Sequence, residues 1–194
     1  MDTRAALLRR IELAPPDARA HGDNHAWVLR DLERLYGAAV AEEVRGLVPP
    51  MEAGSFNYPM AQMLRLLDVA ALTAGRHSGE AYEQVLERLA ALNIRGFLEG
   101  ALGRALWMRV PREMHAALEW SVVSTRSSVS HGRRRYEKRG PREAVVFYRE
   151  ELLGPAWMRG IFLGGLQLLM PEPPRIDVEN VSDEGLTFTL RFTG

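Results

Sequence analysis

The order of elements in the C-terminal part of the chain is the feature that most constrains its fold. After a front half with helical periodicity throughout, residues 119–194 contain two β-like runs, one apolar helix and two more β-like runs. The predicted strands are Val122–His131, Glu143–Arg149, Ile176–Asn180 and Leu186–Phe192, and the predicted helix is Pro155–Met170. Apolar and polar residues alternate in the last run, as in a strand covered on one face. The order predicts an α+β fold in which an N-terminal helical bundle packs on a small C-terminal antiparallel sheet, with one helix inserted between its strand pairs.

The front half shows helical periodicity in five segments. They are Asp2–Leu13, Asp23–Leu47, a helix that opens at Tyr58-Pro59 and reaches Gly75, a long helix from Ser78 to Leu106, and a short one from Pro111 to Trp120. Pro15-Pro16 stops the first helix, so residues 1–16 are expected to be an appendage on the body. Because 194 residues are enough to bury one core, we expect a single domain over residues 1–194.

Glycines recur inside the predicted helices, where each costs about 1 kcal/mol relative to alanine. They are Gly37 in the second segment, Gly96, Gly100 and Gly103 on nearly one face of the long segment, and Gly160, Gly164 and Gly165 in the late helix. Close packing is expected at Gly37, and the glycines of the long segment let a backbone or a ligand approach closely. The glycines of the late helix have the spacing of membrane helix pairs, but packing in a soluble core is the favoured interpretation.

Composition excludes several chemistries. The chain has no cysteine, which excludes disulfides, thiolate zinc sites, iron–sulfur ligation and a cysteine nucleophile. The longest nearly uncharged apolar run, Gly160–Met170, is far shorter than the ~20 residues that span a bilayer. The first residues show no apolar signal-peptide region. We therefore expect a cytoplasmic protein with no integral membrane association.

Positive charge gathers between Arg104 and Arg142. Within it, Arg133, Arg134, Arg135, Lys138 and Arg139 are expected to be exposed at the tip of a hairpin and to bind an acidic protein partner. A solvated hairpin whose charge discourages edge pairing is the alternative. Nucleic acid is disfavoured as a partner, because the whole chain has a formal net charge of zero.

The histidines offer weaker candidates. His21 and His25 are four residues apart, a spacing that suits zinc, but zinc needs a third ligand, so polar residues around a helix start are the favoured interpretation. His131 fits a turn better than a catalytic base, which needs a placed partner. The sequence shows no phosphate loop, dinucleotide fingerprint or nucleophile elbow. It therefore predicts no metal site, no cofactor and no catalytic residue.

Several short motifs resemble one known family. They are Tyr58-Pro59, Gly96-Phe97-Leu98 with Gly100, Gly103-Arg104-Ala105-Leu106 and Met158-Arg159-Gly160-Ile161-Phe162. From roughly Trp27 to Phe192 the chain is similar to a family of paralogous proteins of this length, known mainly from myxobacteria and described as a domain of unknown function. In element order, that family is similar to a superfamily of ligand-binding domains that includes heme nitric-oxide sensors, four-vinyl-reductase domains and vesicle-tethering subunits.

The resemblance implies a ligand-binding fold without the cofactors of those relatives. Heme sensors of the superfamily use a histidine on a helix and a Tyr-x-Ser-x-Arg motif that grips the propionates. His115 precedes the predicted strands, but no Tyr-x-Ser-x-Arg occurs in the chain, so we expect no heme. The chain also lacks the cysteines that tethering subunits can acylate and that four-vinyl-reductase proteins can use to bind metal.

These observations favour a non-enzymatic cytoplasmic regulatory module that binds a partner protein or an apolar small ligand. The alternatives are a small-molecule sensor with an internal apolar pocket and an enzyme of unrecognised type. The candidate ligand-binding residues are Gly96, Phe97, Gly100, Trp107, Met158 and Phe162. Apolar stripes on the second, third and fourth helical segments further predict a homodimer.

Overall fold

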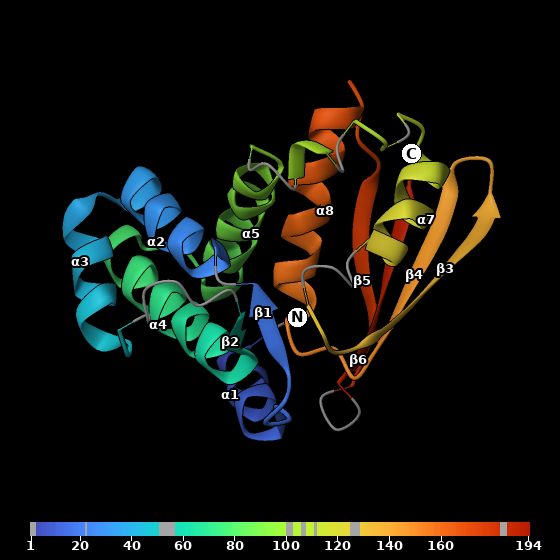
Figure 1. Ribbon diagram of the computed structural model, residues 1–194. Helices are drawn as coiled ribbons and strands as arrows, with labels where there is room; N and C mark the ends of the chain where they lie inside the picture. Colours follow the sequence, from blue (N-terminus) through green and yellow to red (C-terminus); the bar gives the residue numbers. More distant parts are fainter. Residues whose placement is uncertain are drawn as a thin grey trace.

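The helical front half and the strand-rich tail lie side by side, and the helix of residues 155–169 lies between them (Figure 1). The computed structural model describes residues 3–21, 23–50, 57–99, 103–105, 108–110, 112–124, 129–182 and 186–194. Its helices are α1 Arg4–Leu13, α2 Asp23–Tyr36, α3 Ala38–Leu47, α4 Met60–Ser78, α5 Tyr82–Glu99, α7 Met114–Ser124 and α8 Pro155–Leu169. Its strands are β1 Arg19–His21, β2 Asn57–Pro59, β3 Arg133–Gly140, β4 Glu143–Arg149, β5 Arg175–Ser182 and β6 Thr187–Thr193. None of these helices is long and apolar enough to cross a membrane.

The four C-terminal strands form one antiparallel sheet in the order β3-β4-β6-β5. Tyr148 of β4 stacks on Phe188 of β6 with ring centroids 4.5 Å apart. Phe162 of α8 contacts Phe192 of β6 edge-on at 5.1 Å, which joins the helix to the sheet. Each such aromatic pair adds about 0.5–1.5 kcal/mol beyond the area it buries. The predicted α+β class is confirmed, including the helix between the two strand pairs.

The last two predicted strands are also found, and they pair with each other as an antiparallel hairpin. Strands β5 and β6 pair with Ile176 opposite Phe192 and Val178 opposite Leu190. These apolar residues share one face because side chains alternate along a strand. The connecting residues 183–185 lie outside the described part of the chain.

Gly37 separates two helices, which corrects the prediction of one helix from Asp23 to Leu47. Its φ of +92° lies in the region that favours glycine, so the chain turns there between α2 and α3. The expected close packing is wrong, because a Cβ built on Gly37 would meet nothing within 4 Å. The glycine serves the backbone conformation and not a contact.

The predicted first strand is wrong where the structure describes it. Val122 and Ser124 belong to the last turn of α7, and Val129 makes a single bridge to Ala20 of β1. Residues 125–128 lie outside the described part. Valine favours a strand locally, but here it lies at the end of a helix whose buried residues are His115, Ala117 and Leu118.

The apolar stripes that predict a dimer are largely covered within the chain. Met60, Met63 and Leu67 of α4 and Leu86 of α5 are buried in the core. Helix α1 contributes to the same core through Leu7 and packs against α4. Self-association therefore stays a prediction, and these buried side chains are not free to form a dimer interface.

Candidate ligand-binding site

A cavity of about 160 Å³ lies between α5, α7 and α8. Helix α8 lines it with Trp157, Met158, Ile161, Phe162, Gly165, Leu166 and Leu169; α5 with Asn93, Ile94, Phe97 and Leu98; and α7 with Ala117, Leu118, Trp120, Ser121 and Ser124. The other described lining residues are Ala20, Asn24, Met63, Val110, Val129 and Leu153. None of these described side chains carries a charge. Such a wall suits an uncharged and mostly apolar molecule, because burying an unpaired charge is costly.

Helical periodicity explains which residues reach the cavity. On α5, Asn93 and Phe97 are four residues apart, and on α8 the lining residues Met158, Phe162 and Leu166 follow the same interval. Residues four apart share one face of a helix. The helix spacing therefore brings apolar faces of three helices together around one space.

Two glycines of α8 allow it to lie unusually close to α5. A Cβ at Gly160 would come 2.7 Å from the Ala90 Cβ, and a Cβ at Gly164 would come 2.7 Å from the Ala91 Cα. Real Cβ atoms do not approach this closely, so glycine is required at both positions. The favoured interpretation, close packing in the core, is confirmed for Gly160 and Gly164, whereas a Cβ at Gly165 would meet Ile94 only at an ordinary 3.8 Å.

An ion pair closes one side of the α5–α8 contact. Arg159 of α8 pairs with Glu87 of α5, and its Nε donates a hydrogen bond to the Ile176 carbonyl of β5 at 2.9 Å. One guanidinium thus links α8 to both α5 and the sheet. Further along, Arg95 of α5 donates to Gln167 of α8 at 3.0 Å.

Three of the six predicted ligand-binding residues meet at the cavity: Phe97, Met158 and Phe162. Gly96 does not line it, because it faces α2, where a Cβ would come 3.4 Å from the Trp27 ring. Gly100 and Trp107 lie outside the described residues. A ligand-binding role for the three lining residues remains a prediction.

Sequence reasoning missed the two tryptophans, Trp120 and Trp157, and the amide of Asn93. Trp157 lies four residues before Ile161 and eight before Gly165, which also line the cavity, so it follows a second row of residues at helical spacing on α8. Asn93 interrupts the apolar stripe that Leu86, Leu89 and Phe97 form at helical spacing on α5, which is the pattern of a polar group placed in a core. For Trp120 no local signal existed, since only the placement of α7 brings it to the cavity.

His115 lies on α7 and does not line the cavity. Its Nδ1 is 2.7 Å from the Tyr136 hydroxyl of β3, and its Nε2 is 2.8 Å from the Pro141 carbonyl. Both ring nitrogens are therefore used in hydrogen bonds that hold α7 against the β3–β4 hairpin. The geometry gives His115 a structural role.

The basic segment forms edge strand β3, which corrects its expected place at a hairpin tip. Arg134 contradicts the expectation of exposure, because its side chain is 4% exposed and pairs with Glu151, which is 2% exposed. Glu151 also accepts a hydrogen bond from the Leu153 amide at 3.2 Å. This buried pair fastens β3 to the segment that leads into α8. Its carboxylate partner lies 17 residues away in the sequence, which concealed it.

The other basic side chains of β3 are exposed as expected. Arg133 lies 3.4 Å from Glu150, and Arg135 and Arg139 lie 3.4 Å and 3.0 Å from Glu137. Arg135 also lies over the Phe147 ring at 4.4 Å. Lys138 is exposed too. These carboxylates offset part of the positive charge that the strand presents.

His25 is buried and not placed as a zinc ligand. Its ring contacts Tyr58 with centroids 4.7 Å apart, and burial lowers the pKa of its imidazole to about 4. No group of three histidine, aspartate or glutamate side chains that could hold a metal occurs in the described part of the chain.

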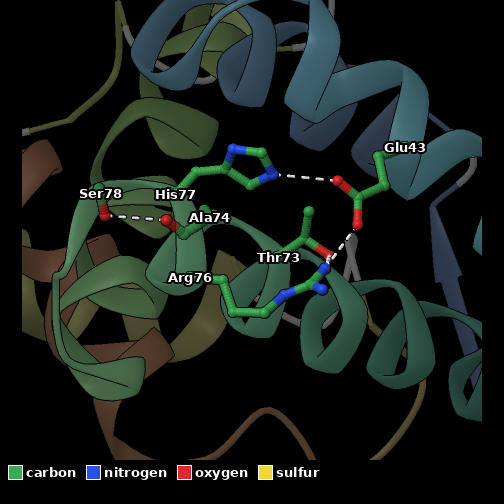
Figure 2. A network of polar contacts seen from close by, with 6 residues as sticks. All are labelled: Glu43, Thr73, Ala74, Arg76, His77 and Ser78. Atoms are coloured by element: carbon green, nitrogen blue, oxygen red, sulfur yellow. Dashed lines mark hydrogen bonds and ion pairs between the residues drawn. The ribbon is translucent and has the colours of Figure 1, made fainter.

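Glu43 joins α3 to the end of α4 through two hydrogen bonds (Figure 2). His77 Nε2 lies 3.0 Å from one carboxylate oxygen, and Arg76 donates to the other at 2.5 Å. These bonds, first that of His77 and then that of Arg76, lower the pKa of the Glu43 carboxyl. None of these three residues lines the cavity. Their hydrogen bonds connect helices α3 and α4 at the surface.

The same fold occurs in solved H-NOX structures. The unliganded Fe(II) H-NOX protein of K. algicida is 13% identical with a TM-score of 0.60, and the match covers 89% of this chain and 95% of that one. A variant of the T. tengcongensis H-NOX protein is 13% identical with a TM-score of 0.62, covering 89% and 96%. A third structure, from work on heme redox potential and porphyrin distortion, is 14% identical with a TM-score of 0.61, covering 90% and 99%. At such identities the likeness shows the fold alone.

The family assignment comes from the sequence. No protein with a curated description matches this chain. The sequence profile of the family described as "Protein of unknown function (DUF2378)" matches residues 28–193. Because this match spans most of the chain and every element from α3 to β6, the protein belongs to the DUF2378 family.

Proposed function

We propose that the protein is a non-enzymatic regulatory module that senses a small apolar molecule in the cavity between α5, α7 and α8. The absence of charged side chains among the described lining residues and the volume of about 160 Å³ carry this proposal. An apolar cavity of about 150 Å³ is large enough to bind a benzene-sized molecule. The shared H-NOX fold supports a ligand-binding role, since one of the similar structures comes from work on how a protein distorts porphyrin and modulates heme redox potential.

Heme itself does not fit the residues of this chain. His115 uses both ring nitrogens in hydrogen bonds and lies away from the cavity wall. The chain has no Tyr-x-Ser-x-Arg motif to hold propionates. The cavity is also smaller than the roughly 300 Å³ at which pockets for larger ligands begin. We therefore assign the site to a smaller molecule than heme.

A ligand in this cavity would touch the helix that connects the two layers. Phe162 of α8 lines the cavity and also packs on Phe192 of β6. Arg159, one turn away, bonds to the backbone of β5. A shift of α8 on ligand binding would therefore displace its contacts with β5 and β6, and so transmit ligand binding to the sheet.

The test fills the cavity from Gly165. A Cβ at Gly165 would have ordinary contact with Ile94 at 3.8 Å, so Gly165→Leu can extend a side chain into the cavity. The matched control is Gly46→Leu on α3, where a Cβ would meet nothing within 4 Å. Toluene serves as the probe, and the thermal unfolding midpoint Tm is measured against its concentration.

A molecule that binds only the folded state raises Tm as its concentration rises. We expect this rise in the wild type and in Gly46→Leu, and its loss in Gly165→Leu. An unchanged Tm of the wild type in toluene, or an equal rise in Gly165→Leu, would overturn the proposal.

The exposed basic residues of β3 favour an acidic protein as the partner that receives the signal. Arg133, Arg135, Lys138 and Arg139 remain on the surface of this edge strand. Reversing Arg133 and Lys138 to glutamate should weaken binding of such a partner, with the effect shrinking at high salt. A partner affinity that ignores both the charges and the salt would contradict this.

A further inference from the structure

Asn93 is the one polar side chain that is buried in the described wall of the cavity. It is 4% exposed and lies one helical turn before Phe97 on α5. Its Nδ2 donates a long hydrogen bond of 3.4 Å to the Asn24 carbonyl in the first turn of α2. No described residue donates a hydrogen bond to its Oδ1. A buried amide that leaves an acceptor and a donor proton without a partner among the described residues is unusual in a protein core, so a hydrogen-bonding group of a ligand would stabilise it.

The two serines of the wall, unlike Asn93, donate their hydroxyl protons within their own helix. Ser121 donates its hydroxyl to the Leu118 carbonyl at 2.7 Å, and Ser124 donates to the Ser121 carbonyl at 3.2 Å. Both protons thus go to carbonyls of their own helix, as is common for serine inside helices. The described wall holds a second amide, that of Asn24, but Asn24 is only partly buried, so Asn93 is the buried residue of the described wall that offers both a donor and an acceptor.

We propose that Asn93 selects the ligand, which is a neutral ring of about benzene size that carries one hydrogen-bonding group, as a phenol does. The inference rests on the proposed function of the cavity. The ring would pack among Phe97, Trp157 and Phe162, and the polar group would exchange a hydrogen bond with the Asn93 amide. A charged ligand is excluded because no described lining residue could pair with it.

The test compares phenol with toluene, which have the same shape but differ in a hydroxyl and a methyl group. The dissociation constants of both are measured by calorimetry for the wild type, Asn93→Leu and a control, Ile161→Val. The control removes one methylene group from the wall and leaves every polar atom in place. The ratio of the two constants cancels changes in cavity volume and reports the hydrogen bond.

We expect the preference for phenol over toluene to fall about fivefold or more in Asn93→Leu, as for the loss of one hydrogen bond of about 1 kcal/mol. The ratio should stay unchanged in Ile161→Val. If Asn93→Leu does not fold, the wild type still decides the matter by ¹⁵N NMR, because phenol should shift the Asn93 side-chain amide signal more than toluene does.

The possible failures are distinct. An unchanged ratio in Asn93→Leu, or equal amide shifts with the two probes, would overturn the role of Asn93 and leave the cavity site standing. Absence of binding of both probes to the wild type would overturn the cavity site itself.

Discussion

Gly164 of α8 lies directly against Ala91 of α5, with room for a hydrogen atom and for nothing larger between the two backbones. A Cβ at Gly164 would come 2.7 Å from the Ala91 Cα and closer still to its carbonyl oxygen. Gly165, the next residue, lines the cavity and has ordinary contact distances. Two adjacent glycines of one helix therefore have different reasons to be there.

This contrast predicts opposite effects of one substitution. Gly164→Ala should lower the free energy of unfolding by about 2 to 3 kcal/mol, because the added methyl group forces two backbones apart. Gly165→Ala should raise it by up to about 1 kcal/mol, since alanine is the better helix former and no atom must move. Urea unfolding of both variants beside the wild type measures the two values. Equal effects of the two substitutions would show that α5 and α8 can move apart to accept a methyl group at position 164.

Arg134 is predicted to be the basic residue of β3 on which stability depends. Arg134→Ala should cost about 3 to 5 kcal/mol, because it leaves the Glu151 carboxylate buried without its partner. Arg133 is 79% exposed, so Arg133→Ala should change stability by no more than about 0.5 kcal/mol. Denaturant unfolding at pH 7 compares the two. A small loss in Arg134→Ala would mean that water reaches Glu151.

His25 is predicted to make stability depend on pH. Burial lowers the pKa of its imidazole from 6.5 to about 4, so between these values the unfolded chain binds the proton and the folded chain does not. The contribution of His25 is therefore complete above about pH 6.5 and falls as the pH decreases toward 4, by a loss on the order of 3 kcal/mol.

The measurement is the free energy of unfolding from pH 7 to pH 4 for the wild type and for His25→Phe, which keeps a ring beside Tyr58. The variant should lose the part of the slope that lies between pH 6.5 and 4. The same slope in both proteins would assign the pH dependence to other groups.

The protein is predicted to bind neither heme nor zinc in a stoichiometric amount. Incubation with hemin followed by gel filtration should leave no Soret band on the protein, because His115 is held by Tyr136 and Pro141. Elemental analysis after dialysis should find less than one equivalent of zinc. A Soret band that is lost in His115→Ala would contradict the assigned role of this histidine.

Elements with strong local periodicity were predictable from the sequence. Leu186, Phe188, Leu190 and Phe192 alternate with polar residues, and this period can satisfy only a strand with one buried face. The helix at 155–169 likewise follows from its apolar spacing and its opening proline. Phe97, Met158 and Phe162 could be singled out because each lies beside a glycine-rich helical motif.

Local preference failed where long-range contacts compete with it. Val122 and Val123 favour a strand, but they lie in the last turn of α7, which packs on β3. Arg134 has the same sequence surroundings as Arg133 and Arg135, and only the approach of Glu151 from beyond β4 makes it a buried residue. Such burial depends on which segments pack together, and neither the 3.6-residue period of a helix nor the two-residue period of a strand determines that.

The sequence by itself determined the class of the fold, the order of its elements and the places where α8 could approach a neighbour. Tertiary structure alone decided that α5, α7 and α8 would enclose a cavity and that Asn93 would face it. The physical reason is that helix and strand periods arise from neighbouring backbone bonds, whereas a cavity is the space left when three distant helix faces pack imperfectly.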